Sequence, residues 1–280
     1  MENCILVADS GSTKTDWILH SSKHGIFEYH TAGINAVRDS EDAMFLVLYE
    51  ELMPALPQTA QIKHIHFYGA GCIPPYSQKL RQSLARLFPE AHINVESDLL
   101  GAARALCGHN SGIACILGTG SNSCLYDGTR IIANVSPLGF ILGDEGSGAV
   151  LGKTLLGQLL KGVLPASLKE AFLTEYSLTP TDIIDKVYRQ PQPNKFLASL
   201  VPFIHRHRQH LGIHTLLVEQ FRLFITRNVA HYGHPEAPVH FTGSIAKIFT
   251  PELQEALSAE GYKLGKIIQK PIQELVNFHT

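Results

Sequence analysis

The stretch Ile5–Leu19 constrains the fold of this chain more than any other. Two short apolar runs, rich in branched residues, flank a Gly/Ser/Thr turn, which predicts two strands joined as a hairpin rather than a strand followed by a helix. Gly11 allows a tight turn, and Ser12 and Thr13 add hydroxyl groups beside exposed N–H groups. Such a turn can bind a phosphate. Asp9, at the end of the first run, is better matched to a hydrated Mg²⁺ than to a bare phosphate.

A second stretch, Ile113–Leu125, has the same shape. Aligning Gly120-Ser121 with Gly11-Ser12 places Thr119 on Ser10 and Gly118 on Asp9. One copy alone would be read as an ordinary Gly/Ser hairpin, because short glycine motifs match often by chance. Two copies, one near the start of each half, favour two related domains whose turns hold a polyphosphate from both sides. The absence of the acid from the second copy fits a single metal site.

Composition excludes several classes of protein. The 280 residues are enough for two domains, and a formal charge of −2 gives no basic footprint for nucleic acid. No apolar run approaches the roughly 20 residues that a membrane helix needs. The N-terminus enters a strand without a signal-peptide pattern, so we expect a cytoplasmic protein. The five cysteines contain no C-x-x-C pair and are expected to be buried and reduced.

The first half predicts a mixed sheet covered by helices. The expected elements are a strand at Gly25–His30, a helix capped by Ser40 and stopped by Pro54, a strand at Ile62–Tyr68, a helix at Pro75–Phe88, a strand at Ile93–Val95 and a helix at Leu99–Leu106. Gly108–Gly112 is the expected boundary between domains, so the first domain spans residues 1–110.

The second half begins in the same way and then departs. The expected elements are strands at Ile113–Leu117, Ser123–Tyr126 and Arg130–Ala133, a helix at Ala149–Leu164, a helical stretch from Ser167 to about His231 broken near Pro191–Pro193 and near Gly212, and a strand at Pro238–Phe241. We expect a second domain over residues 111–266. Residues 267–280 are expected to form a helix that could fold back on the first domain.

Three polar residues beside glycines or strand ends are candidates for chemistry. Asp98 opens a helix, where it could be a catalytic base or a simple cap, although Ser97 could cap instead. Asn35 offers a donor and an acceptor to sugar hydroxyls, or is a turn residue. Asp144 lies in a Gly-flanked acidic pair that either binds a ligand or complements the dipole of the helix that follows.

Two other patterns carry no site. The His-rich run His205–His210 lies in an amphipathic helical region and lacks the spacing of metal ligands, so we expect a solvated face. Lys14 does not follow the P-loop pattern, and its turn leads to a strand.

In order along the chain, these residues resemble the N-acetylglucosamine kinase branch of the actin/Hsp70/sugar-kinase superfamily, within the BadF/BadG/BcrA/BcrD ATPase-like group. The matching blocks are Asp9–Asp16, Gly33–Asn35, Ser97–Ala103, Leu117–Asn122 and Gly139–Ser147, and Thr242–Ser244 resembles the adenosine motif. The resemblance implies an α/β fold of two ribonuclease H-like, actin-like ATPase domains with mixed sheets flanked by helices and a cleft between them.

The resemblance also implies a function and a site. The function is phosphorylation of an amino sugar by ATP with Mg²⁺, with N-acetylglucosamine and its 6-hydroxyl as the leading choice. Asp98 matches the catalytic base, and Asp9 would hold the metal. The residues that would bind the sugar are Asn35, Asp98, Ser121, Asn122, Pro137, Leu138, Gly139 and Asp144. Those that would bind ATP are Gly11, Ser12, Thr13, Thr119, Gly120, Gly243 and Ser244.

The chain departs from related patterns in informative places. The family often has more glycine in the first turn, where this chain has Asp9-Ser10, and the bridging cysteines of the iron–sulfur activators are absent. Alternatives are a kinase for glucosamine or another cell-wall sugar, and a sensor that keeps the fold without turnover. A homodimer is common in related kinases, and we expect no nucleic-acid or membrane partner.

Overall fold

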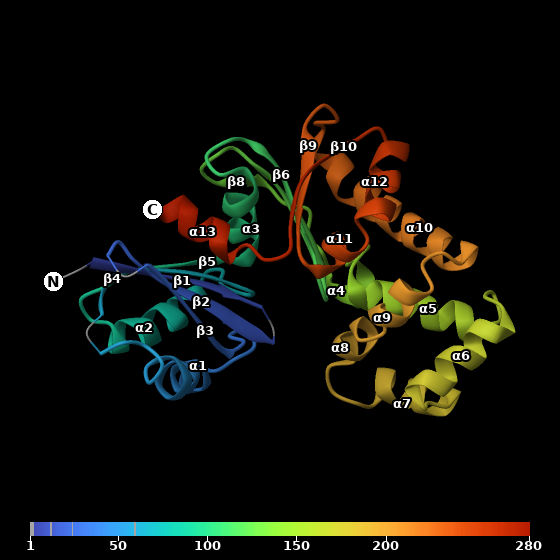
Figure 1. Cartoon of the computed structure of the whole chain (residues 1–280), viewed down its shortest axis with the longest axis horizontal. Helices are drawn as coiled ribbons and strands as arrows, with labels where there is room; N and C mark the ends of the chain where they lie inside the picture. The colour runs from blue at the N-terminus through green and yellow to red at the C-terminus, as the bar shows by residue number, and fades with distance from the viewer. Residues whose placement is uncertain (1–2, 12, 24, 59) are drawn as a thin grey trace. The chain divides into compact units, whose positions relative to one another are not determined.

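The computed structural model describes residues 3–11, 13–23, 25–58 and 60–280. The chain divides into two compact units. Unit 1 comprises Met1–Asn110, Gly128–Arg130 and Lys270–Thr280, and unit 2 comprises Ser111–Asp127 and Ile131–Gln269. Unit 2 is therefore inserted into unit 1, whose last segment follows unit 2 in the sequence (Figure 1).

The sheet of unit 1 has the strand order β3-β2-β1-β4-β5. Its strands are β1 (Asn3–Ser10), β2 (Lys14–Ser21), β3 (Gly25–Ala32), β4 (Gln61–Gly69) and β5 (His92–Ser97). The first three strands are antiparallel, whereas β4 and β5 run parallel to β1 and to each other. The predicted opening hairpin is confirmed, and its register places Asp9 directly opposite Asp16.

Helices cover both faces of this sheet. They are α1 (Glu41–Val47), continued by the π-helical turn η1 (Leu48–Leu52), then α2 (Ser77–Leu87), α3 (Asp98–Cys107) and α13 (Ile272–His279). Figure 1 shows α1 and α2 on one face of the sheet and α3 and α13 on the other. On the first face, the buried rings of Trp17 and Phe67 meet edge to face, with centroids 5.5 Å apart, in a core shared with Leu48 and Leu84. The expected cap is present, because the Ser40 hydroxyl accepts from the Ala43 N–H at 3.2 Å.

The sheet of unit 2 has the order β10-β9-β6-β7-β8, which repeats that of unit 1 strand for strand. Its strands are β6 (Gly112–Leu117), β7 (Ser121–Tyr126), β8 (Ile131–Ala133), β9 (Pro238–Thr242) and β10 (Lys263–Ile268). Three strands are again antiparallel, and the last two again run parallel to the first. The expected fold class, two mixed sheets flanked by helices, is confirmed.

Most of the helices of unit 2 lie between β8 and β9. The helical elements are α4 (Gly139–Leu142), α5 (Gly148–Leu160), α6 (Ala166–Tyr176), α7 (Pro180–Tyr188), α8 (Pro193–Ala198), α9 (Val201–Arg206), α10 (Leu211–Arg227), the 3₁₀ turn η2 (Val229–Tyr232), α11 (Ser244–Ile248) and α12 (Thr250–Ala259). Phe221 and Phe224 of α10 are fully buried in the core that also contains Phe241 of β9.

Two sequence expectations were wrong in detail, and one strand was not predicted. Residues 267 and 268 belong to β10, and the final helix begins only at Ile272, after Pro271. Strand β10 was missed because Lys263, Gly265 and Lys266 dilute its apolar pattern. The helix expected over Ala149–Leu164 ends at Leu160, shortly before Gly162 adopts a φ of 70°. The break expected near Gly212 is confirmed, because α9 ends at Arg206 and α10 begins at Leu211, which places Gly212 in the first turn of α10, where its N–H donates to the His210 ring.

All five cysteines lie within the described residues, are buried as predicted, and form no disulfide with one another. Among the helices of the described residues, none has both the length and the apolar character needed to cross a membrane.

Candidate functional site

The candidate residues of unit 1 gather around the β1–β2 turn. Gly11 closes the turn by donating its N–H to the Lys14 carbonyl at 3.0 Å. Gly33 lies against this turn so closely that a Cβ there would stand 2.4 Å from the Gly11 carbonyl oxygen and 2.7 Å from the Thr13 nitrogen. The turn therefore requires glycine at position 33. Gly11 and Thr13 are exposed, so their polar groups can meet a ligand, and Ser12 lies outside the described residues.

A buried hydroxyl fixes Asn35 beside the turn. The Ser10 side chain donates to the Ile34 carbonyl and accepts from the Ile34 N–H, both at 3.0 Å. Asn35 follows, and its Oδ1 accepts from the N–H groups of Val37 and Arg38, both at 3.1 Å. The side-chain oxygen of Asn35 therefore stabilises the turn, as one of the two expectations held. The Nδ2 group is left as the one suited to donate to a ligand.

Asp98 is the first residue of α3 but not its cap. The Ser97 hydroxyl accepts from the Leu100 N–H at 3.2 Å and fills the cap position. The Asp98 carboxylate instead accepts from the Leu99 N–H at 2.9 Å. Burial raises the pKa of Asp98, and hydrogen bonds from the N–H groups of Leu99 and of Asp98 itself partly oppose that rise. A carboxyl group with a raised pKa at a helix start is suited to proton transfer.

Asp9 lies near Asp98, and both carboxyl groups belong to unit 1. Burial, followed by the negative charges of Asp98 and Asp16, raises the pKa of Asp9 to about 7, while Lys270 and Lys14 lower it in part. A bound cation would stabilise two neighbouring carboxylates of this kind and would attract a phosphate. No group of three or more His, Cys, Asp or Glu side chains in the described part of the chain could hold a metal by itself. The donor set suits Mg²⁺, which keeps several waters and needs only one or two carboxylates.

Sequence reasoning missed Asp16 and Lys270. The buried Asp16 carboxylate pairs with Lys14 at 3.1 Å, with His30 at 2.8 Å and with Lys270 at 3.0 Å. Burial raises the pKa of Asp16, but the hydrogen bonds from Lys270 and Lys14 outweigh it, so the net pKa is lowered. Hairpin pairing could have identified Asp16, because it faces Asp9 across the turn. Nothing in the sequence near Lys270 indicated its partner.

The candidate residues of unit 2 gather around the β6–β7 turn. Gly118 closes this turn by donating to the Gly120 carbonyl at 2.9 Å, and the N–H groups of Gly148 and Ala149 donate to the Gly118 and Thr119 carbonyls at 2.8 and 3.1 Å. The turn therefore rests on the first residues of α5. Gly243, with a φ of 112°, lies against β6, where a Cβ would approach the Leu117 carbonyl oxygen to 2.3 Å. Thr119, Gly120, Gly243 and the exposed Ser244 thus lie at one end of the sheet.

Asp144 faces the same turn. Its carboxylate accepts from the Ser121 N–H at 3.3 Å, and its own N–H donates to the Pro137 carbonyl at 2.9 Å. The backbone of Asp144 is left-handed, with a φ of 54°, as is that of the exposed Leu138, with a φ of 59°. Burial raises the pKa of Asp144 to about 6, the Ser121 N–H lowers it, and the charge of Glu145 raises it. Asp144, Ser121 and Pro137 are therefore brought together.

The remaining candidates of unit 2 flank these residues. Asn122 follows Ser121 in β7, and its Oδ1 accepts from the Ser123 N–H at 2.9 Å and from Asn134 Nδ2 at 3.0 Å. Gly139 begins the short helix α4, whose Ile141 and Leu142 side chains are exposed. The Thr242 hydroxyl, one residue before Gly243, is buried and has no hydrogen-bond partner among the described residues.

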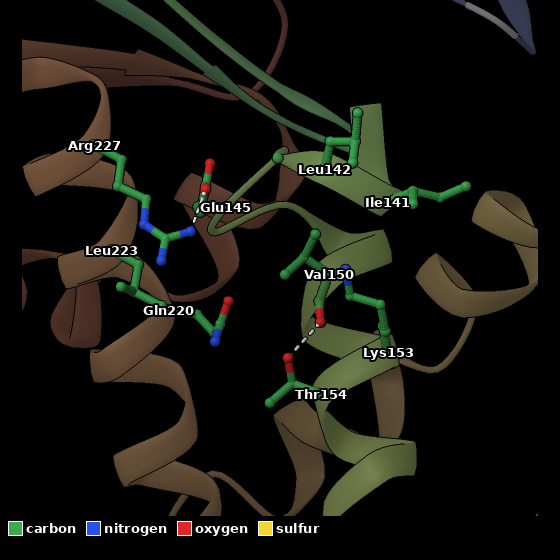
Figure 2. A pocket seen from close by; sticks show the side chains of 10 residues that line it. Ile141, Leu142, Glu145, Val150, Lys153, Thr154, Gln220, Leu223 and Arg227 are labelled. Carbon is green, nitrogen blue, oxygen red and sulfur yellow. Dashed lines mark hydrogen bonds and ion pairs between the residues drawn. The ribbon is translucent and has the colours of Figure 1, made fainter. Parts of the chain in front are cut away.

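A cavity of about 200 Å³ lies in unit 2 directly behind the Asp144 loop. Figure 2 shows that α5 and α10 form its walls, with the Glu145–Arg227 ion pair at one edge and the apolar side chains of Ile141 and Leu142 at another. The charged partners at this edge are 2.9 Å apart.

Two units, each with the same five-stranded sheet and an exposed Gly-containing turn between its first two strands, define an actin-like ATPase fold. A scan against protein-family models and a search of curated proteins found no match. Among solved structures, the "Putative N-acetylglucosamine Kinase" from Porphyromonas gingivalis shares 48% sequence identity with this chain, with a TM-score of 0.95 over 98% of each chain. This chain belongs to the same family, the N-acetylglucosamine kinase-like branch of the actin/Hsp70/sugar-kinase superfamily.

More distant structures share the fold alone. The "Putative N-acetylglucosamine Kinase" from Chromobacterium violaceum is 20% identical, with a TM-score of 0.79 over 99% of each chain. A ROK family glucokinase from Streptomyces griseus, solved with glucose and AMPPNP, is 13% identical, with a TM-score of 0.54 over 98% of each chain.

Proposed function

We propose that this protein transfers the γ-phosphoryl group of ATP to a hydroxyl of an amino sugar, with the 6-hydroxyl of N-acetylglucosamine as the preferred acceptor. Membership of the family supports the reaction class. The observation that carries the proposal is the seating of Asp98 on the first turn of α3, near Asp9 and freed from capping by Ser97.

The proposed chemistry is a direct transfer. The sugar oxygen forms a bond to the γ-phosphorus as the bond from that phosphorus to the bridging oxygen breaks, and ADP leaves. Asp98 accepts the proton that the sugar hydroxyl loses, a role that a carboxyl group with a raised pKa can perform near neutral pH. Asp9 would hold Mg²⁺, which would supply positive charge that stabilises the phosphoryl group.

The other candidates receive binding roles. The turn residues Gly11, Thr13, Thr119 and Gly120 would contact the phosphates, with the hydroxyl groups of the exposed Thr13 and Thr119 as donors, and Gly243 and Ser244 would contact the nucleoside. Asn35 and Asp144 would form hydrogen bonds with sugar hydroxyls, flanked by Ser121, Asn122 and Pro137–Gly139. The proposed reaction requires residues of both units to act on one pair of substrates. Because it consumes ATP, we also propose a cytoplasmic location.

The direct test is ADP production measured over a panel of amino sugars and hexoses. We expect N-acetylglucosamine to give the highest kcat/KM, and glucosamine or another cell-wall sugar in first place would reassign the substrate. Absence of sugar-dependent ADP release with every sugar, alongside sugar binding in calorimetry, would favour a sensor.

Asp98→Asn tests the base. We expect kcat to fall roughly 10²–10⁴-fold while sugar binding persists, since only proton transfer is removed. The matched control is Ser97→Ala, which removes the neighbouring cap and should cost about 1 kcal/mol of stability with kcat changed far less. Near-normal turnover by Asp98→Asn would remove Asp98 from the mechanism.

A further inference from the structure

The loop that carries Asp144 is anchored on two sides. On one side, Lys153 of α5 donates from Nζ to the Phe140 carbonyl at 2.5 Å. On the other, Arg227 near the end of α10 donates from Nη1 to Glu145 Oε1 at 2.9 Å. Figure 2 shows the Arg227 side chain reaching from α10 to Glu145 across the edge of the cavity.

The loop is also fitted to α10 by shape. Gly146 adopts a φ of 72°, and a Cβ there would lie 3.2 Å from Phe221 Cδ1 and 3.3 Å from Phe224 Cβ. Those two side chains are fully buried, so they cannot move away to make room for a side chain at Gly146. The residue between this fixed glycine and Asp144 is Glu145.

Glu145 is buried, whereas the Arg227 side chain is 60% exposed. Within the described residues, Arg227 is the one basic side chain in salt-bridge contact with Glu145. A buried carboxylate that loses its partner is costly and is driven toward water. Because Glu145 is the covalent neighbour of Asp144, such a movement would displace the Asp144 carboxylate from Ser121.

We infer, taking the proposed sugar-binding role of Asp144 as given, that Arg227 is a positioning residue for Asp144 and acts through Glu145. Arg227 itself does not touch the sugar. Its guanidinium neutralises Glu145, which otherwise stands as a second negative charge beside Asp144, and ties the loop to α10. The expected consequence is that α10, whose residues belong to none of the matching sequence blocks, helps to set the affinity for the sugar.

The cavity supplies a way to test this role chemically. It is lined by Glu145, Val150, Lys153, Gln220, Leu223 and Arg227, among others, and its volume of about 200 Å³ would admit a free guanidinium ion once the arginine side chain is removed. Added guanidinium should therefore restore the missing charge beside Glu145 in a truncated variant.

The experiment compares Arg227→Ala with Arg222→Ala. Arg222 lies on the same helix, is similarly exposed and pairs with Glu260 at 2.6 Å, away from the loop. We expect Arg227→Ala to raise the KM for the sugar about tenfold, because a displaced Asp144 would lose one charged hydrogen bond to the sugar. Its kcat and its KM for ATP should stay within about threefold of wild type, and Arg222→Ala should leave all three unchanged.

Two rescues separate positioning from a general loss of folding. Arg227→Lys keeps the positive charge and should recover most of the sugar KM, whereas Arg227→Gln should not. Millimolar guanidinium chloride should lower the sugar KM of Arg227→Ala and leave that of Arg222→Ala unaltered. Loss of thermal stability and kcat with an unchanged sugar KM would overturn the inference, because it would show a structural role only.

The outcomes also separate this inference from the proposed function. If the wild-type protein neither binds nor phosphorylates an amino sugar, both are wrong. If wild type is active and Asp144→Asn weakens sugar binding in calorimetry, while Arg227→Ala binds sugar as wild type does, the function stands and the positioning role of Arg227 is overturned.

Discussion

Asp9 and Asp16 face each other across the β1–β2 hairpin, yet their carboxyl groups have pKa values shifted in opposite directions. Both shifts begin with burial, which raises each pKa. Asp16 then receives hydrogen bonds from Lys270 and Lys14, which more than offset burial, whereas Asp9 experiences mainly the negative charges of Asp98 and Asp16. One member of the pair is thus held by the protein, and the other is left for a cation.

Asp16→Asn should therefore destabilise unit 1. The substitution leaves Lys14 and Lys270 without the carboxylate on which they converge. We expect a loss of about 1–3 kcal/mol in the free energy of unfolding, typical of a charged hydrogen-bonded group. Urea denaturation at pH 7 measures it, with Asp182→Asn of the exposed α7 capping box as the control. A variant as stable as wild type would show that the three contacts contribute nothing net.

Gly33→Ala should damage the β1–β2 turn. The added Cβ would stand within 2.7 Å of backbone atoms of Gly11, Thr13 and Lys14, and none of these is a flexible side-chain end. We expect a loss of roughly 1–3 kcal/mol in unfolding free energy and a raised KM for ATP. The control is Gly157→Ala on α5, where a Cβ meets nothing within 4 Å. Because alanine favours helices, that control should gain up to about 1 kcal/mol.

Asp144→Asn should stabilise the protein while weakening sugar binding. The pKa of Asp144 is raised from 3.8 to about 6, chiefly by burial, so the folded state disfavours the charged form. This penalty is absent below pH 3.8, grows as pH rises to about 6 and is then constant. We expect asparagine, which tolerates left-handed backbone and keeps the acceptor for Ser121, to add about 1–3 kcal/mol at pH 8 and almost nothing at pH 3.5.

The matching measurement for Asp144→Asn is calorimetry with the sugar and, separately, with an ATP analogue. Sugar affinity should fall at least tenfold, about the value of one charged hydrogen bond, while nucleotide affinity should hold. Equal losses for both ligands would argue against a sugar-binding role.

His66 and His279 should make the protein sensitive to acid. Their rings stack with centroids 3.5 Å apart. The pKa of His66 is lowered from 6.5 to about 3 by burial and then by His279 and other nearby cationic groups, and that of His279 is lowered from 6.5 to about 4 by burial and then by Arg104. Both rings are therefore neutral when folded.

Below pH 6.5 the unfolded state binds more protons than the folded state, so the free energy of unfolding falls as the pH falls. Stability contributed by the neutral rings is complete above that pH and is lost as pH falls toward 3 or 4. His66→Phe keeps the stack but cannot take a proton. Between pH 7 and pH 4.5, we expect the free energy of unfolding of the variant to fall by roughly 1–2 kcal/mol less than that of wild type. Urea midpoints at both pH values, with the exposed His231→Gln as control, measure this.

Local patterns predicted much of the fold. Strand periodicity identified both opening hairpins, and the capping serines Ser40 and Ser97 identified the starts of α1 and α3. Strand β10 was not predicted because its run holds two lysines and a glycine, and its place is set by parallel pairing with β9, which no local window contains. The similarity of the two halves could have predicted β10, because β5 in unit 1 implies a corresponding strand in unit 2.

Local patterns also predicted some of the candidate site residues and not others. Asp98 and Asp144 could be named as candidates because each lies beside a recognisable element start or glycine pair. Lys270 and Arg227 could not, because each reaches its carboxylate partner from an element remote in sequence. Long-range charge pairs leave no periodicity in the sequence, so only the fold reveals them.

The insertion of unit 2 into unit 1 has a consequence for biosynthesis. Lys270 and α13 leave the ribosome after every residue of unit 2 has been made. Since domains generally fold as units during synthesis, the second sheet can close while the first still lacks its last helix and the lysine that holds Asp16. The half of the protein that is translated first is therefore the half that matures last.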